Sequence, residues 1–428
     1  MKRPLLAITG CALFSTLLLS GCATPLSGPR RGSKDHTYIA YWPPVDGAKT
    51  RVAVKDLIDM QGVVTTAGSQ FFAKTRKPAA SDAACLRGMR GGNVQIVGRT
   101  NLTELAVGVT GINDYFGTPR NPVTANGRRI PGGSSSGSAA AVANGTADIA
   151  IGTDTAGSIR VPAACCGIVG LKTTFGLVPI DGVYPISPRH LDTVGPMAKD
   201  VAHTAQGMDL LKPGFAGRYR AAVAAKPSAG MIRVGRLRVR GTSEKVDRAV
   251  DDALARTGFK VVELGGDFQK WWTQAQTDGN TIAAASAWLT NRRLLIAPGV
   301  TARTKAIITL GLVESQTRYA GALKRQAAWQ GTLRVVFKNV DFIALPTLQT
   351  LPPKLPFFGL SAAFEALVLV SQNTVAVNYA GNPALAVPIP VDDEHVLVSS
   401  LQLVGPRLSE AALLNAGRLV EASGVRRE

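Results

Sequence analysis

The sequence predicts an α/β fold. Its 428 residues are 46% hydrophobic, which is enough apolar material to bury a large core. The Val-Ala-Val run at 52–54 is typical of the end of a buried strand, and the small residues of 138–143 are typical of a tightly packed helix. We also expect helices over 283–295 and 313–336, so strands and helices both contribute to the fold.

Two glycine-serine turns are the most informative local feature. The chain reads PGGSSSGS over 131–138 and GTDTAGS over 152–158. Glycine allows positive φ and a close approach of backbone to ligand, so two such turns can aim hydroxyl and main-chain N–H groups at one reacting atom. A flexible linker is the alternative, but the helix expected directly after the first turn has no role in a linker. The pattern therefore favours catalysis by a serine nucleophile.

The chain resembles the amidase signature family, whose members are serine hydrolases with a Ser-Ser-Lys triad. The resemblance implies one amidase domain over 37–428, with a mixed β-sheet core covered by helices. It weakens over 210–339, which we expect to be a variable region on the substrate side. The segments that carry it, in order, are 51–69, 82–87, 96–106, 131–162, 167–176, 191–198, 341–347, 378–388 and 401–405.

The resemblance implies a catalytic triad of Lys55, Ser134 and Ser158. Ser158 would attack the carbonyl carbon of the substrate, and Ser134, which adjoins a cis peptide bond in the family, would pass the proton to Lys55. An exposed lysine has a pKa of about 10.4 and stays protonated. Lys55 can therefore act as a base only if burial or its neighbours lower that pKa substantially.

The turn over 153–158 would form the oxyanion hole. Its donors would stabilise the negative charge that develops on the carbonyl oxygen in the transition state. By the same resemblance, Asp154 and Arg160 would support the turn from a buried network, because an unpaired buried charge is costly. The oxyanion donors would be the main-chain N–H groups of Thr155, Ala156, Gly157 and Ser158.

A competing pattern lies inside the first turn. Gly133-Ser-Ser-Ser-Gly137 matches the Gly-x-Ser-x-Gly elbow of α/β-hydrolases, which would make Ser135 the nucleophile. That elbow requires a buried strand directly before it, whereas 128–133 offers two arginines and then a breaker. Short motifs of this kind also arise often by chance, so we favour the Ser-Ser-Lys interpretation. The histidines available to Ser135 would be His190, His203 and His395.

The sequence carries no signature of a metal or nucleotide cofactor. It lacks His-Glu-x-x-His and Cys-x-x-Cys, which are typical of zinc sites, and the Gly-x-x-x-x-Gly-Lys-Ser/Thr loop that binds nucleotide phosphates. We therefore expect a hydrolase without a metal or other cofactor.

The N-terminus resembles a bacterial lipoprotein signal. Lys2 and Arg3 precede an apolar stretch over 5–19 that is short for a bilayer span and is typical of an export signal. This stretch ends in Leu-Ser-Gly-Cys, so residues 1–21 would be the signal peptide and Cys22 would be lipidated. An ordinary cleaved signal peptide is the alternative.

Lipidation would place the protein in the cell envelope. Residues 22–36 would form a tether, and the absence of Asp at Ala23 favours the periplasmic face of the outer membrane in a host with two membranes. Cys85, Cys165 and Cys166 would be the thiols of the mature chain, with a disulfide from Cys85 to either of the others left open.

The charge balance is strongly basic. The net charge of +19 is typical of nucleic-acid-binding proteins, but export excludes nucleic acid as a partner. The membrane, reached through the lipid anchor, is the expected partner instead. Seven basic residues suggest a face that lies against anionic headgroups or is simply solvated: Arg303, Lys305, Arg318, Lys324, Arg325, Arg334 and Lys338.

These observations predict an envelope amidase. It would hydrolyse the carboxamide bond of a small linear amide, and also esters, through an acyl-enzyme on Ser158. A non-catalytic envelope-binding lipoprotein that retains the amidase fold is the alternative. The related subunit that generates ammonia for transfer-RNA amidation would lack its cytoplasmic substrate after export. The sequence names neither the amide nor an oligomeric state.

Overall fold

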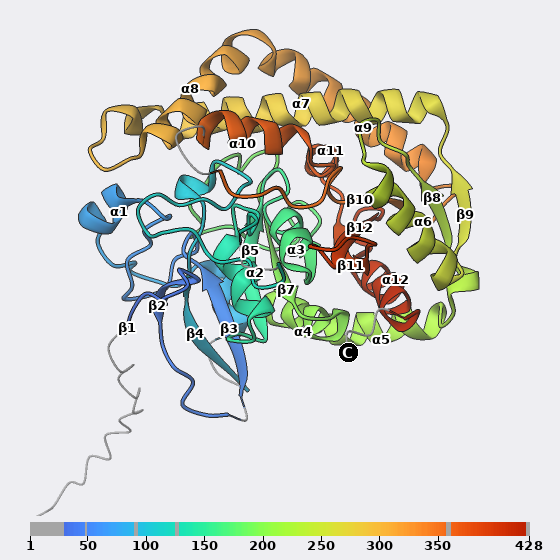
Figure 1. Ribbon diagram of the computed structural model, residues 1–428, viewed down its shortest axis with the longest axis horizontal. Helices are drawn as coiled ribbons and strands as arrows, with labels where there is room; N and C mark the ends of the chain where they lie inside the picture. Colours follow the sequence, from blue (N-terminus) through green and yellow to red (C-terminus); the bar gives the residue numbers. More distant parts are fainter. Residues whose placement is uncertain (1–29, 48, 90–92, 125–127, 357–360, 425–428) are drawn as a thin grey trace, which may run out of the picture.

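A computed structural model describes residues 30–47, 49–89, 93–124, 128–356 and 361–424. The predicted signal peptide, residues 1–21, and the predicted lipidation site, Cys22, lie outside these ranges. Within them the chain forms a single α/β domain whose mixed sheet is covered by helices (Figure 1), which confirms the predicted fold class.

A twelve-stranded sheet runs through the described part of the chain, in the order β1-β2-β4-β3-β5-β7-β6-β11-β12-β10-β8-β9. Strand β3 pairs in parallel with β4 and β5, whereas β7 is antiparallel to β5 and β6. The strands are β1 (Arg30–Arg31), β2 (Tyr38–Tyr41), β3 (Thr50–Lys55), β4 (Val94–Thr100), β5 (Ile149–Asp154), β6 (Val169–Lys172), β7 (Thr193–Ala198), β8 (Arg233–Arg236), β9 (Lys260–Glu263), β10 (Phe342–Pro346), β11 (Ala384–Pro390) and β12 (Val398–Val404).

Helices connect most of these strands and cover the sheet. The α-helices are α1 (Gln70–Thr75), α2 (Ser136–Ala143), α3 (Arg160–Cys166), α4 (Val201–Leu211), α5 (Phe215–Ala225), α6 (Glu244–Thr257), α7 (Gly266–Asn291), α8 (Ala302–Thr317), α9 (Tyr319–Val336), α10 (Ser361–Val370), α11 (Val375–Ala380) and α12 (Glu410–Ala422). Short 3-10 helices are η1 (Ala84–Met89), η2 (Glu104–Ala106), η4 (Ala229–Met231) and η5 (Arg292–Ile296).

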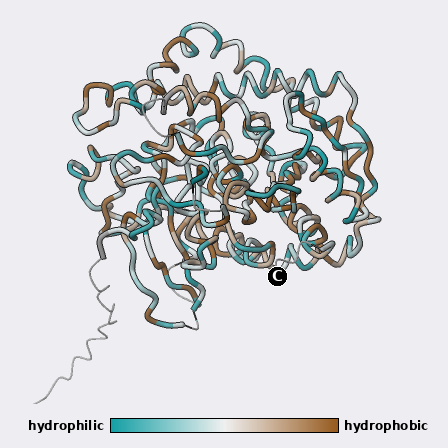
Figure 2. Tube along the Cα trace, in the orientation of Figure 1, coloured by the Kyte–Doolittle hydropathy of each residue, from teal (hydrophilic) through white to brown (hydrophobic). Residues whose placement is uncertain are grey.

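The core is layered around the sheet. The main cluster joins side chains of α4, α6 and α12 to one face, and a second cluster joins α2 and α3 to the other. Hydrophobic stretches run through the middle of the molecule, whereas the outer helices alternate between hydrophobic and hydrophilic along their length (Figure 2). This alternation is typical of helices that bury one face and expose the other.

The strand and the helix that carry the first half of the predicted site have the secondary structure that the sequence predicts. The predicted strand end at 52–54 is the buried part of β3, and the predicted helix at 138–143 lies within α2. Every residue of α2 from Ser136 to Val142 is buried, and small side chains let this helix lie close to the sheet.

The helices over 266–336 differ from the expected helix boundaries. The helix expected over 283–295 is the second half of α7 followed by η5, and the one expected over 313–336 is divided into α8 and α9 at Arg318. The composition on both sides of Arg318 favours helix, so the sequence pattern alone does not show the break. Trp272 and Trp329 are buried in the core, where their rings meet edge to face.

Three details bear on the envelope predictions. Residues 30–36 belong to the predicted tether 22–36, and there β1 pairs with β2 so that this stretch adjoins the sheet. Cys85, Cys165 and Cys166 are buried free thiols, so the disulfide left open by the sequence is not formed. None of the helices in the described ranges combines the length and apolar character that a membrane span needs.

The expectation that Arg303 belongs to an exposed basic face is wrong. Its side chain is buried and contacts the carboxylates of Asp114 and Glu365 at 3.2 and 3.5 Å. It cannot meet a lipid headgroup from that position. Lys324, Arg334 and Lys338 are exposed.

Substitution of Gly137 by alanine tests how closely α2 packs against its neighbours. A Cβ at this position would lie 2.5 Å from the main-chain nitrogen of Asn101 and would also meet the carbonyl oxygen of Thr37. Alanine normally favours a helix over glycine, yet we expect Gly137→Ala to lower the free energy of unfolding by about 1–3 kcal/mol through overpacking. Urea unfolding of the full chain measures the change. Gly217→Ala on exposed α5 is the control and should be neutral or slightly stabilising; equal stability of both variants would contradict this account.

Candidate active site

Lys55 is the last residue of β3 and is fully buried. Its Nζ donates hydrogen bonds to Ser134 Oγ at 2.7 Å and to Thr153 Oγ1 at 2.8 Å. Burial lowers the pKa of the Lys55 ammonium to about 7, although the negative charges of Asp154 and Asp192 act in the opposite direction. Lys55 can therefore be neutral near pH 7, as a catalytic base must be.

Ser134 lies in the loop that enters α2, and its side chain is buried. The peptide bond between Gly133 and Ser134 is cis, as the resemblance implied. The loop is fixed on both sides, since the main-chain nitrogen of Gly133 donates to Val109 and the carbonyl of Ser134 accepts from the main-chain nitrogen of Thr103. These contacts hold the Ser134 hydroxyl against Lys55.

Asp154 and Arg160 form a buried ion pair behind the second turn, at 3.0 Å. The carboxylate of Asp154 also accepts the main-chain N–H groups of Gly157 and Ile159, at 2.8 and 3.2 Å. Burial would raise the pKa of Asp154, but the charge and hydrogen bonds of Arg160 outweigh it and hold that pKa at about 2. The turn is therefore shaped around a permanent negative charge.

Arg160 connects this turn to the C-terminal part of the chain. Its guanidinium donates to Gln402 Oε1 on β12 at 2.7 Å and to Asn378 Oδ1 on α11 at 2.5 Å. Asn378 in turn donates to the Asp154 carboxylate at 2.8 Å. Segments more than 200 residues apart in sequence thus fix the position of one turn.

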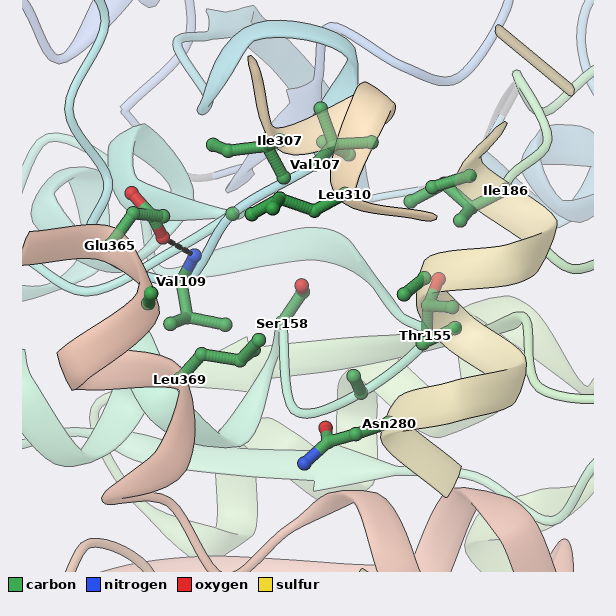
Figure 3. A pocket seen from close by; sticks show the side chains of 17 residues that line it. Val107, Val109, Thr155, Ser158, Ile186, Asn280, Ile307, Leu310, Glu365 and Leu369 are labelled. Atoms are coloured by element: carbon green, nitrogen blue, oxygen red, sulfur yellow. Dashed lines mark hydrogen bonds between the residues drawn. The ribbon is translucent and has the colours of Figure 1, made fainter. Parts of the chain in front are cut away.

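Ser158 lies just before the start of α3. It lines a cavity of about 140 Å³ (Figure 3). The main-chain nitrogen of Ser135 donates to the carbonyl of Ser158 at 3.3 Å, which joins the two turns. Within the described residues, no hydrogen bond links the hydroxyls of Ser158 and Ser134. The structure therefore brings Lys55 and Ser134 into direct contact and places Ser158 beside them with its hydroxyl available to a ligand.

Thr155 lines both the Ser158 cavity and a second one. Its hydroxyl donates to the buried carboxylate of Asp192 at 2.7 Å. Burial raises the pKa of Asp192, whereas that hydroxyl and the main-chain N–H groups of Ile186 and Ser187 act to lower it. The second cavity, lined by Asp192 and Thr153 among others, measures about 250 Å³.

The competing nucleophile, Ser135, is buried and its hydroxyl donates to the main-chain carbonyl of Thr153 at 3.3 Å. No hydrogen bond joins it to a histidine in the described ranges. His203 pairs instead with Asp200, and His190 lies against the ring of Tyr319. The geometry does not support a Ser-His arrangement on Ser135.

Several residues of the site carried no role in the sequence interpretation. Thr153, Asp192, Asn378 and Gln402 stand in segments that resemble the family, but their types alone do not reveal what they contact. Asn280, which lines the cavity from α7, had no sequence signal that indicated a role in the site. Among the described residues, no group of three or more His, Cys, Asp and Glu side chains is placed to hold a metal ion.

Comparisons with known proteins identify one family. A family model described as Amidase matches residues 50–414. A glutamyl-tRNA(Gln) amidotransferase subunit of Halobacterium salinarum is 33% identical over 426 residues, which cover 88% of this chain and 96% of that protein. The 2-amino-5-chloromuconic acid deaminase of Comamonas testosteroni is 32% identical over 392 residues, covering 87% and 80% of the two chains.

A solved structure extends the similarity to the fold. The corresponding glutamyl-tRNA(Gln) amidotransferase subunit of Thermotoga maritima superposes with a TM-score of 0.74 at 25% identity, covering 91% of this chain and 88% of that one. The match therefore extends over most of both chains, in sequence and in structure. The chain belongs to the amidase family.

Proposed function

We propose that this protein hydrolyses a carboxamide through a covalent acyl-enzyme on Ser158, with Ser134 and Lys55 as the proton relay. The observation that carries the proposal is the buried Lys55 Nζ, hydrogen-bonded to Ser134 beside the serine that opens onto the cavity. A lysine held in this way, with its pKa lowered to about 7, is suited to accept a proton.

In the acylation step, the Oγ of Ser158 forms a bond to the carbonyl carbon of the amide. Its proton passes to Ser134 Oγ, and the proton of Ser134 passes to neutral Lys55 Nζ. Thr153 Oγ1 accepts a hydrogen bond from Lys55 and so orients the nitrogen lone pair toward Ser134. No hydrogen bond joins the two serine hydroxyls within the described residues, and catalytic contacts of this kind commonly tighten when substrate binds.

The oxyanion would form at the turn before Ser158. The main-chain N–H of Gly157 already donates to Asp154. We therefore assign stabilisation of the oxyanion chiefly to the N–H groups of Thr155, Ala156 and Ser158, with Gly157 holding the turn in shape. The tetrahedral intermediate then expels the amine, which takes its proton back from Lys55 through Ser134.

Deacylation repeats these steps with water. The water gives its proton to Ser134 and Lys55 as its oxygen attacks the acyl carbon, and Ser158 leaves with a proton returned along the same route. The products are a carboxylic acid and ammonia or an amine, and no cofactor enters the balance.

The relatives favour a second candidate function. The Halobacterium amidotransferase subunit matches over 96% of its own length, which is consistent with a chain that supplies ammonia within a larger complex. Both functions use the same Ser158 chemistry and differ in the amide that enters the cavity. We favour a small-molecule amidase because of the cavity lining described below.

We also propose a lipid-anchored envelope location, on the sequence of the N-terminus alone. If Cys22 is acylated, the full chain expressed in a bacterium with two membranes should incorporate labelled palmitate and sediment with the membranes, and Cys22→Ser should lose both properties. Cys85→Ser is the matched control and should keep the label, since Cys85 is buried. An unlabelled wild-type chain, or label retained in Cys22→Ser, would refute the anchor.

Substitution of the relay tests the mechanism directly. We expect Ser158→Ala and Lys55→Met each to lower kcat for amide hydrolysis by about 10³-fold or more, because loss of the nucleophile or base leaves only the oxyanion hole and binding. Ser135→Ala is the control and should keep most activity. Steady-state kinetics on the full chain measure the effect; full activity in Ser158→Ala, or inactivity confined to Ser135→Ala, would transfer the role to another serine. A fully folded wild type without activity toward any amide would support the non-catalytic alternative.

The pH profile tests the protonation state of Lys55. Because Lys55 must be neutral to accept a proton, kcat/KM should rise with pH below about 7 and level off above it. Lys172 is also buried, with its pKa lowered to about 7 chiefly by desolvation, so a variant must assign the inflection. We expect Lys172→Met to retain the inflection. Its disappearance in that variant, or a profile that is flat from pH 5 to 9, would argue against Lys55 as the base.

A further inference from the structure

The variable region contributes a strip of small side chains to the wall of the Ser158 cavity. Ala283, Ala284 and Ala287 lie within about one turn of each other on one face of α7, and all three line the cavity. Ile307 and Leu310 of α8 line the same cavity with branched aliphatic side chains (Figure 3). Alanine at these three positions leaves open the space that larger side chains would fill.

The polar groups of this cavity are few, and half of them are already bonded. Its four polar side chains belong to Thr155, Ser158, Asn280 and Glu365, and the other thirteen of its seventeen lining residues are apolar or glycine. Thr155 donates its hydroxyl to Asp192. Among these lining residues, the Ser158 hydroxyl and the Asn280 amide remain for a ligand.

Glu365 does not offer its charge to the cavity. Its carboxylate accepts the main-chain N–H groups of Val109 and Thr110 as well as the Thr110 hydroxyl, and it lies 3.5 Å from the guanidinium of Arg303. These contacts turn both oxygens toward the loop and toward α8. No lysine, arginine or histidine is among the lining residues.

Asn280 supplies the remaining polar contact. Its Oδ1 is buried and has no hydrogen-bond partner among the described residues, although an acceptor in that position normally has one. The alanine strip thus ends in a side-chain amide whose unpartnered oxygen can accept an N–H or O–H of a ligand.

We propose that this cavity selects uncharged amides with a compact apolar acyl group, a specificity that rests on the proposed function of Ser158. A dry apolar cavity of roughly 150 Å³ holds a molecule such as benzene, so a chain of about six carbons matches the 140 Å³ present here. Glutamine fits poorly, because its ammonium and carboxylate would be buried without a partner of opposite charge.

The test compares three amides on the full-length chain. We expect kcat/KM for hexanamide to exceed that for acetamide by roughly 10-fold or more, because an apolar wall rewards each buried methylene. Glutamine should be hydrolysed at background rates. Hydrolysis of acetamide or glutamine as fast as hexanamide would overturn the proposal.

Substitution of the alanine strip locates the preference. Ala284→Leu should lower kcat/KM for hexanamide by about 10-fold while changing that for acetamide little, since only the longer chain meets the added bulk. Ala283→Leu provides a second variant if the first does not fold. Ala327→Leu, on the exposed side of α9, is the matched control and should leave both substrates unchanged. Equal losses on both substrates in folded Ala284→Leu would contradict an acyl pocket at this strip.

The same assay distinguishes failure of the proposed substrate preference from failure of the proposed hydrolysis through Ser158. If Ser158→Ala hydrolyses the amides as fast as wild type, the proposed function fails. If that variant is inactive but wild type shows no preference for hexanamide, only the specificity fails.

Discussion

The burial of Lys55 is the constraint on which the site depends. A protonated lysine at this depth lacks water and has no carboxylate among its hydrogen-bond partners, which are the hydroxyls of Ser134 and Thr153. Desolvation therefore weakens its charged form, and the pKa falls toward the range in which the neutral amine can accept a proton. The strand that carries Lys55 lies in the interior of the sheet, between β4 and β5, so the same packing that stabilises the fold also lowers the pKa of the proposed base.

The second constraint is the charge beneath the Ser158 turn. Asp154 stays ionised because Arg160 and three further donors surround it, and Arg160 is itself held by side chains from the C-terminal segments. A buried ion pair of this kind adds little net stability, but removal of one partner leaves the other as an unpaired buried charge, which destabilises the fold. Its role is therefore to fix one geometry for the turn, with Ser158 facing the cavity.

The sequence predicted the parts of the site that local chemistry dictates. The buried end of β3 and the packed helix α2 follow from an apolar run and from small residues, whereas the pairing of Lys55 with Ser134 was implied by the family resemblance. The contacts of Arg160 with Asn378 and Gln402 could not be predicted, because they depend on which strands become neighbours in the sheet. The prediction that Arg303 lies on an exposed basic face was wrong for a related reason. The spacing of basic residues along α8 does not show that Arg303 pairs with the buried Glu365, which lies on α10, far away in the sequence.

The central claim is that Ser158 is the nucleophile and that Lys55 activates it. Fluorophosphonate labelling of the full chain, followed by peptide mass spectrometry, tests both parts at once, because the reagent is attacked only by an activated serine. We expect one modified peptide, with the phosphonyl group on Ser158, and loss of that modification in Lys55→Ala. Labelling of Ser135 instead, or undiminished labelling of Ser158 without Lys55, would contradict it.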